Sequence, residues 1–282
     1  MRGFILKSLP GIVALFVAAE SHAQSVHTLF SINDTATRVK MPAAKKPKPI
    51  RTELSFGARL NTNGWGIFAD KAWVRSNESR LSDMFYNLRV AEIEFSEVKH
   101  PKEVKHTNTF LNTSGGDRPK PYIYGKMNNF YTFKLGYGFR RMIAGKPEPG
   151  TVSIHWTYLG GLSLGLLKPY YIDAYVPQDN GGTYIRETIK YSEETKEAFL
   201  TDYLAIGKAP FTKGLNEIKF IPGLHAKTGL HFDFANNRRT VIGVDAGVSA
   251  DLYTQKIELM ANQEAYPYVL NIYAGIQFGK RW

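Results

Sequence analysis

The sequence predicts an all-β protein, an antiparallel up-and-down barrel of eight strands that spans a membrane and carries long loops at one end. Three observations predict it. Eight segments after Ile50 alternate apolar and polar residues with a period of two, the pattern of strands with two different faces. Their polar face is rich in glycine, which in a narrow tube leaves room for lysine, arginine and histidine but in a soluble sheet only weakens strands. Many segments have about 9 to 11 residues, which suits a tilted membrane crossing.

Composition removes several function classes. The chain has 282 residues, 43% of them hydrophobic, a formal charge of +11 and no cysteine. Disulfide scaffolds, thiolate metal sites, thiol enzymes and lipid attachment through cysteine are therefore excluded. The sequence has neither a phosphate-cradling glycine loop nor an HExxH spacing, so we expect no cofactor and no metal.

Residues 1–23 have the layout of a cleaved secretory signal. Arg2 and Lys7 give a positive start, residues 9–19 are apolar, and Ser21-His22-Ala23 places small residues at the cleavage positions. The apolar run is well short of the ~20 residues that a membrane-spanning helix needs. We expect cleavage after Ala23.

A basic, proline-rich segment follows at residues 24–50. It contains five lysines and arginines after position 37 and a single acid, Asp34. This composition predicts an extended periplasmic linker or, alternatively, an arm that docks on an acidic partner or anionic surface. Its few aromatic residues argue against nucleic-acid binding.

The barrel is expected to occupy residues 51–282. The first two strands, 54–60 and 65–69, are joined across Asn63-Gly64, the strongest signal for a tight hairpin. The third, 84–95, changes phase along its length, and a bulge near Ala91 would restore a single apolar face. The other five strands are expected at 131–140, 152–166, 224–234, 242–252 and 270–279.

The connections agree with this count. With eight strands and both ends in the periplasm, alternate connections lie on alternate sides of the membrane. The short turns near Gly145 and Asn236 then fall inside, and the long segments 100–128 and 168–219 fall outside. Outer-membrane barrels show this asymmetry.

Together, the cleaved signal, eight alternating segments, long outer loops and a last strand that ends on an aromatic residue resemble the small outer-membrane β-barrel proteins of Gram-negative bacteria. The resemblance implies that the last strand is read by the barrel-assembly machinery. By position, that signal comprises Leu270, Ile272, Ile276, Phe278 and Trp282. The usual last residue in that family is phenylalanine, and Trp282 departs from it.

The glycine-rich face predicts a polar network inside the tube. A three-residue loop, 237–239, fixes the register of the sixth and seventh strands, so that His231 faces Asp245, His225 faces Asp251 and Lys227 faces Ser249. An eight-stranded tube has room only for side chains, and we expect a paired polar plug in place of a pore. The network is predicted to contain Lys134, Arg140, His225, Lys227, His231, Asp233, Asp245 and Asp251, with Glu92 and Glu94 beside it.

Two competing functions use the same residues. Some small outer-membrane barrels are lipid-modifying hydrolases, and this chain has Ser153, His155, Ser163, His231 and Asp245, but without any recognised catalytic spacing. A ten-stranded, porin-like channel would instead recruit 170–176 and 183–191 as a further membrane hairpin. We expect neither, and we assign no catalytic residues.

The long outer segment, 168–219, exceeds what a simple connection needs. Ser192 is expected to cap a short helix with Glu193 and Glu194 in its first turn and an apolar side from Phe199 to Leu204. Gly181-Gly182 can instead turn an extracellular hairpin that prolongs the fifth and sixth strands. The sequence thus predicts a non-enzymatic outer-membrane barrel with a structural or accessory role, which contacts membrane lipid, the barrel-assembly machinery and a protein partner in an envelope assembly or secretion complex.

Overall fold

A computed structural model describes residues 51–74, 87–113, 118–145, 151–178, 182–234 and 239–282. The predicted signal peptide and basic linker lie outside the described residues, as do Tyr86, Gly181 and most of the 237–239 loop. Within the described part, no helix is long and apolar enough to cross a membrane.

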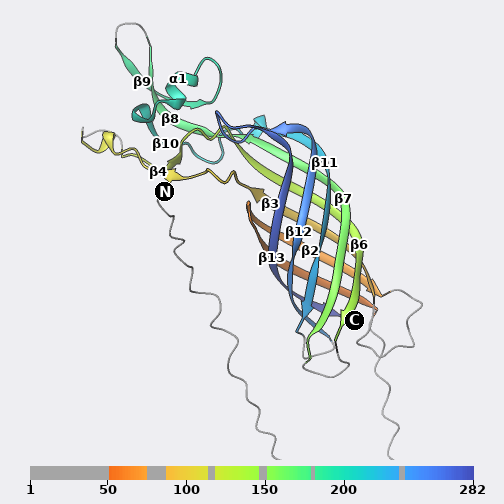
Figure 1. Cartoon of the computed structure of the whole chain (residues 1–282). Coiled ribbons are helices and arrows are strands. Elements are labelled where there is room, and N and C mark those ends of the chain that lie inside the picture. Colours follow the sequence, from red (N-terminus) through yellow and green to blue (C-terminus); the bar gives the residue numbers. More distant parts are fainter. Residues whose placement is uncertain (1–50, 75–86, 114–117, 146–150, 179–181, 235–238) are drawn as a thin grey trace, which may run out of the picture. The chain divides into compact units, whose positions relative to one another are not determined.

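Eight strands close into an antiparallel barrel, in which each pairs with its neighbours along the chain and the first pairs with the last (Figure 1). This confirms the predicted all-β fold. The barrel strands are β1 (Thr52–Asn61), β2 (Gly64–Val74), β3 (Leu88–Val98), β6 (Asn128–Ala144), β7 (Ser153–Pro169), β11 (Lys219–Asp233), β12 (Thr240–Ile257) and β13 (Tyr266–Arg281).

The later strands are longer than expected. β6 and β7 have 17 residues each and β12 has 18, whereas the predicted spans were 131–140, 152–166 and 242–252. Their extra residues lie past the regular alternation, so sequence periodicity underestimated them. Each strand still runs along the barrel once, and the topology is the predicted one.

The predicted bulge near Ala91 is wrong. β3 pairs with β2 and β6 in unbroken register through Ala91. The phase of hydrophobicity changes because Leu88 and Val90 point into the barrel, where they pack with Ala72 and Leu159. The backbone therefore stays regular and the chemistry of the inner face changes along the strand.

The first hairpin turns one residue earlier than expected. Asn61 pairs with Gly64, so Thr62 and Asn63 form the turn and Gly64 starts β2 with a φ of 151°. A Cβ at Gly64 would stand 2.0 Å from the carbonyl oxygen of Glu97 on the neighbouring strand, which explains the glycine.

The predicted outer connections gather at one end of the barrel. The amide of Lys99 donates to Asn63, the amide of Met127 donates to Leu259, and Lys126 forms an isolated bridge with Met260. We call this the long-loop end and the opposite end the short-turn end. The grouping agrees with the parity of the strand count.

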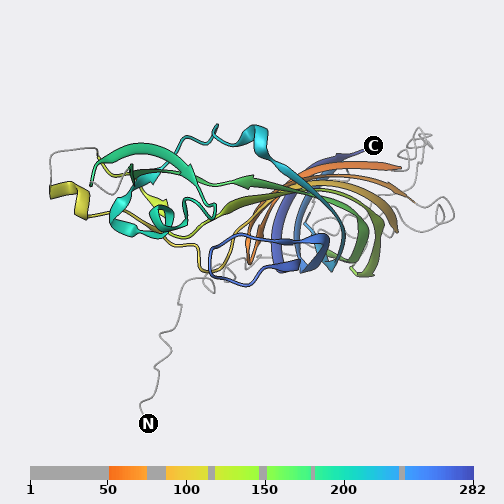
Figure 2. The same cartoon turned by 90° about the horizontal axis from the view of Figure 1, so that it is seen from above.

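A folded layer occupies the long-loop end. β8 (Tyr171–Pro177), β9 (Tyr184–Lys190) and β10 (Ala205–Lys208) form a three-stranded sheet separate from the barrel (Figure 2). The ten-stranded alternative is therefore wrong. The expected hairpin is present as β8 and β9, but it pairs with β10 and does not extend the fifth and sixth barrel strands. The smaller elements are β4 (Lys105–His106), η2 (Phe110–Thr113), β5 (Tyr122–Ile123), α1 (Lys196–Leu200), η3 (Asp202–Leu204) and η4 (Leu215–Glu217).

This layer has its own core. Ile172, Ala174, Ile189 and Phe199 are buried together with Tyr122. The helix is shorter than predicted: α1 begins after Thr195, whose amide is bonded to the Ser192 hydroxyl at 3.3 Å, so Glu193 and Glu194 precede the helix. A buried core makes the layer a folded unit and not a set of independent loops.

Candidate functional site

The two faces of the barrel wall are chemically inverted relative to a soluble protein. Large apolar side chains face outward around the wall and are exposed, for example Leu60 at 73% and Ile272 at 64%. Charged side chains face inward and are buried, for example Arg59 at 3% and Arg140 at 2%. A soluble monomer does not expose an apolar surface of this extent, so the outer wall is the lipid-facing one.

The structure buries all eight residues of the predicted network inside the barrel. The register between β11 and β12 is the predicted one, with His231 opposite Asp245, His225 opposite Asp251 and Lys227 opposite Ser249. This register follows from a short hairpin whose two apolar faces must point the same way.

The buried charges form two ion networks. The central network crosses the lumen: Lys134 contacts Asp251 at 2.9 Å, and Lys227 contacts Glu92. Arg59 bonds to both Glu92 and Glu94, and Lys134 lies 3.6 Å from Glu94, so the two pairs belong to one group. Every cation in it contacts a carboxylate, which offsets the cost of burying its charge.

The second network lies near the short-turn end. Arg140 donates to Glu53 at 2.8 Å and to Asp70 at 3.1 Å. Arg281 bonds to the same Glu53 at 2.8 Å and to Asp233. Sequence reasoning missed Glu53, Arg59, Asp70 and Arg281, although each falls in the inward phase of its strand and that phase was the available signal.

His231 on β11 lies beside the second network and contacts residues on β12 and β13. Its Nδ1 lies 2.7 Å from Asp245 Oδ1 and 3.2 Å from the amide nitrogen of Gln277. The ring fits because its neighbour on β12 is Gly243, where a Cβ would stand 2.3 Å from the imidazole. Glycine inside the barrel thus makes room for a large polar side chain, as the sequence predicted.

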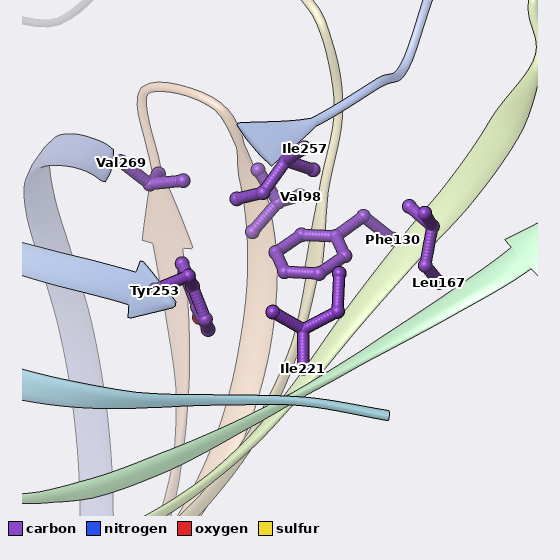
Figure 3. Close-up of a cluster of buried hydrophobic side chains, with 7 residues drawn as sticks. All are labelled: Val98, Phe130, Leu167, Ile221, Tyr253, Ile257 and Val269. Atoms are coloured by element: carbon purple, nitrogen blue, oxygen red, sulfur yellow. The ribbon is translucent and has the colours of Figure 1, made fainter. Parts of the chain in front are cut away.

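A hydrophobic seal closes the lumen toward the long-loop end. It comprises Val98, Phe130, Leu167, Ile221, Tyr253, Ile257 and Val269 (Figure 3). The rings of Phe130 and Tyr253 meet edge to face with centroids 5.2 Å apart. No sequence signal marked this seal, because its residues occupy the inward phase that elsewhere carries charge.

These observations predict that the protein does not conduct ions. Purified protein in planar bilayers is expected to show no stable open channel, because the paired charges fill the tube and the seal closes it. Bilayer recordings across a range of voltages check this. Steady ohmic conductance would contradict the closed lumen, and an unfolded sample is excluded beforehand by heat-modifiable migration on a gel.

The candidate catalytic residues are only partly brought together. His231 and Asp245 are in contact, and the rings of His155 and His231 lie 5.8 Å apart. Ser163, however, is bonded to the hydroxyl of Tyr253 at 2.9 Å, and Ser153 pairs with Asp233 at the opposite end of β7. No serine is among the hydrogen-bond partners of His231 in the described chain. The described residues also contain no group of three metal-ligating side chains.

The residues of the predicted assembly signal lie in one row on the outer face of β13. Leu270, Ile272, Ile276 and Phe278 are 52 to 64% exposed, and Trp282 follows at 57%. A role in barrel assembly stays a prediction.

The outer layer holds a small polar cluster. The Tyr122 hydroxyl donates to Asp202, and His106 Nε2 lies 2.9 Å from the same carboxylate. The hydrogen bond from Tyr122, followed by that from His106, holds the pKa of Asp202 below its usual value. The cluster ties β4, β5 and η3 together, which indicates a structural role.

Comparisons with known proteins add the following findings. Neither a protein-family model nor a curated protein matches the sequence. Solved structures similar to the chain include the attachment invasion locus protein Ail of Yersinia pestis, with 11% identity, a TM-score of 0.38, and coverage of 83% of this chain and 100% of Ail. Neisserial surface protein A is similar at 10% identity and a TM-score of 0.33, covering 82% of this chain and 95% of that protein. The N-terminal β-barrel domain of Pseudomonas aeruginosa OprF follows at 7% and 0.31, covering 83% and 98%. The likeness is one of fold.

Proposed function

We propose that the protein is a non-enzymatic outer-membrane barrel with an accessory role, as a partner or subunit of an envelope assembly or secretion complex. The observation that carries this proposal is the combination of a closed, charge-paired barrel with a folded layer at its long-loop end. A barrel whose lumen is filled and closed offers no path for solute. The layer at the long-loop end is also larger than a protein that serves only as a membrane anchor requires.

Orientation follows from the same proposal. The signal peptide is cleaved after Ala23, the basic segment 24–50 lies in the periplasm, and the long-loop end faces outward. The apolar wall supports membrane insertion, and the asymmetry of short and long connections supports this direction. Two surfaces are then available to a partner: the basic arm on one side and the folded layer on the other.

The expected result is that a protein partner copurifies with the mature chain in mild detergent. Deletion of residues 24–49 is expected to remove a partner held by the arm, because it removes five of the cations that would attract an acidic surface. Mass spectrometry of material purified from membranes at low and moderate salt measures this. A variant that replaces the arm with a neutral spacer of equal length is the matched control.

Retention of no partner by either form contradicts the accessory role. Membrane placement is checked on the same sample: recovery in the soluble periplasmic fraction would contradict the lipid-facing assignment. The contact between His231 and Asp245 favours a lipid-modifying hydrolase as the second candidate. If Ser153→Ala or His231→Ala abolishes a change in lipid composition that the wild type produces, the hydrolase is correct.

A further inference from the structure

A cleft of about 700 Å³ opens between the outer layer and the rim of the barrel. Seven lysines and two glutamates line it, so its formal charge is 7 − 2 = +5. Both glutamates are already occupied, because Glu97 pairs with Lys99 at 3.3 Å and Glu103 pairs with Lys126 at 2.6 Å. The five remaining cations are Lys105, Lys120, Lys168, Lys208 and Lys213.

Lys168 is the most informative of the five. Its side chain is buried, with 3% of the residue exposed, and its ammonium lies 4.6 Å from the centre of the Phe211 ring in the cleft lining. Across the described ranges, no carboxylate lies within salt-bridge distance of it. Burial of a cation is more favourable when an anion lies beside it, so Lys168 is well placed to contact an anionic group in the cleft.

The floor of the cleft is continuous with the lipid-facing wall. Lys168 on β7 pairs with Asn129 on β6. The next outward-facing pair along these two strands is Leu166 with Tyr131, and the one after it is Leu164 with Phe133. Residues two apart on a strand are about 7 Å apart. The outward face therefore changes from apolar to cationic over about two such steps, which matches a lipid whose acyl chains lie beside Phe133 and whose headgroup enters the cleft.

The other residues that line the cleft favour one class of lipid headgroup through their charge and their aromatic rings. The five lysines without a carboxylate partner among the described residues exceed the charge of one phosphate monoester, which is about −1.5 to −2 at neutral pH. Tyrosine and phenylalanine rings from β5, β6 and the segment after β10 give the cleft flat apolar walls. Its volume falls within the ~300 to 1,000 Å³ range of small-molecule sites.

We propose that this cleft binds the headgroup of a multiply phosphorylated glycolipid of the outer leaflet, with Lys168 contacting a phosphate. The proposal rests on the membrane placement of the barrel and not on its accessory role. Loss of a protein partner therefore leaves it unaffected.

The test is equilibrium binding of diphosphorylated lipid A to the purified mature chain in detergent, followed by native mass spectrometry. We expect one lipid per chain. Lys168→Met keeps the aliphatic contact with Phe211 and removes the charge, and it is expected to weaken binding at least tenfold while leaving thermal stability unchanged or raised. Lys168→Arg is expected to retain most of the affinity. Lys256→Gln, an exposed lysine outside the cleft, is the matched control and is expected to bind like the wild type.

Three comparison probes separate the sources of the anion. Dephosphorylated lipid A and phosphatidylglycerol are expected to bind at least tenfold more weakly than the diphosphorylated glycolipid. Equal binding of the dephosphorylated form overturns the proposal. The proposal is also overturned if the glycolipid does not bind and dextran sulfate binds in a way that depends on Lys168. That result would identify a site for a soluble polyanion.

Folding is controlled by heat-modifiable migration of every variant. If Lys168→Met does not fold, the double variant Lys208→Gln/Lys213→Gln supplies the test, because both side chains are exposed. Wild-type affinity in that double variant, or in a folded Lys168→Met, overturns the proposal.

Discussion

Replacement of Arg140 by methionine is expected to destabilise the barrel by about 3 to 5 kcal/mol. The guanidinium is buried and bonds to both Glu53 and Asp70. Methionine fills a similar volume, so the loss comes mainly from Asp70, which stays buried without its cation, whereas Glu53 keeps its bond to Arg281. Urea unfolding of protein refolded into lipid vesicles, followed by the change in gel mobility, measures the free energy of unfolding.

The next residue on the same strand is the matched control. Arg141 points outward, is exposed, and lies over the Tyr158 ring at 5.5 Å. Arg141→Met is expected to cost about 1 kcal/mol or less, the range of an exposed cation over an aromatic ring. The double variant Arg140→Met/Asp70→Asn is expected to recover part of the loss, because it removes the carboxylate that is left without a cation. Equal stability of the two single variants would show that the network does not stabilise the barrel.

Replacement of Phe130 by alanine is expected to cost about 3 to 5 kcal/mol, the range for a buried phenylalanine. Its ring is fully buried in the seal, against Tyr253 and next to Gly165, where a Cβ would stand 2.7 Å from ring atoms. The Phe130 ring packs directly against the backbone at Gly165. Because this backbone belongs to a paired strand, it cannot move far enough to fill the space that alanine leaves.

Phe133→Ala is the control for this change. Phe133 faces outward from the same strand and is 38% exposed, so a smaller loss is expected because part of its surface already contacts lipid. The same unfolding assay compares the two variants. Equal losses would contradict the assignment of Phe130 to a packed seal.

The number and order of the barrel strands and the register of the hairpin between β11 and β12 could be predicted from the sequence. Each of these depends on neighbours in the chain: alternation is a property of one strand, and a short turn fixes which residues face each other. For this reason His231 opposite Asp245 was predictable before any coordinates, whereas the first turn, shifted by one residue at Thr62, was not.

The contacts between interior groups across the lumen could not be predicted in this way. Lys134 on β6 bonds to Asp251 on β12, and Lys227 on β11 bonds to Glu92 on β3. These strands are not neighbours in the sheet, so their contacts depend on the width and tilt of the closed tube, which no local pattern encodes.

The tertiary structure also decided where the inner face is apolar and where the outer layer makes a cleft. Phe130 and Lys134 occupy the same inward phase of β6, yet one is part of a seal and the other of an ion network. In the sequence, Lys168 is one more cation at the end of a strand. Its burial depends on Phe211, which comes 43 residues later in the chain. Periodicity specifies the side of a strand on which a residue lies, whereas closure of the barrel and folding of the loops specify what it contacts there.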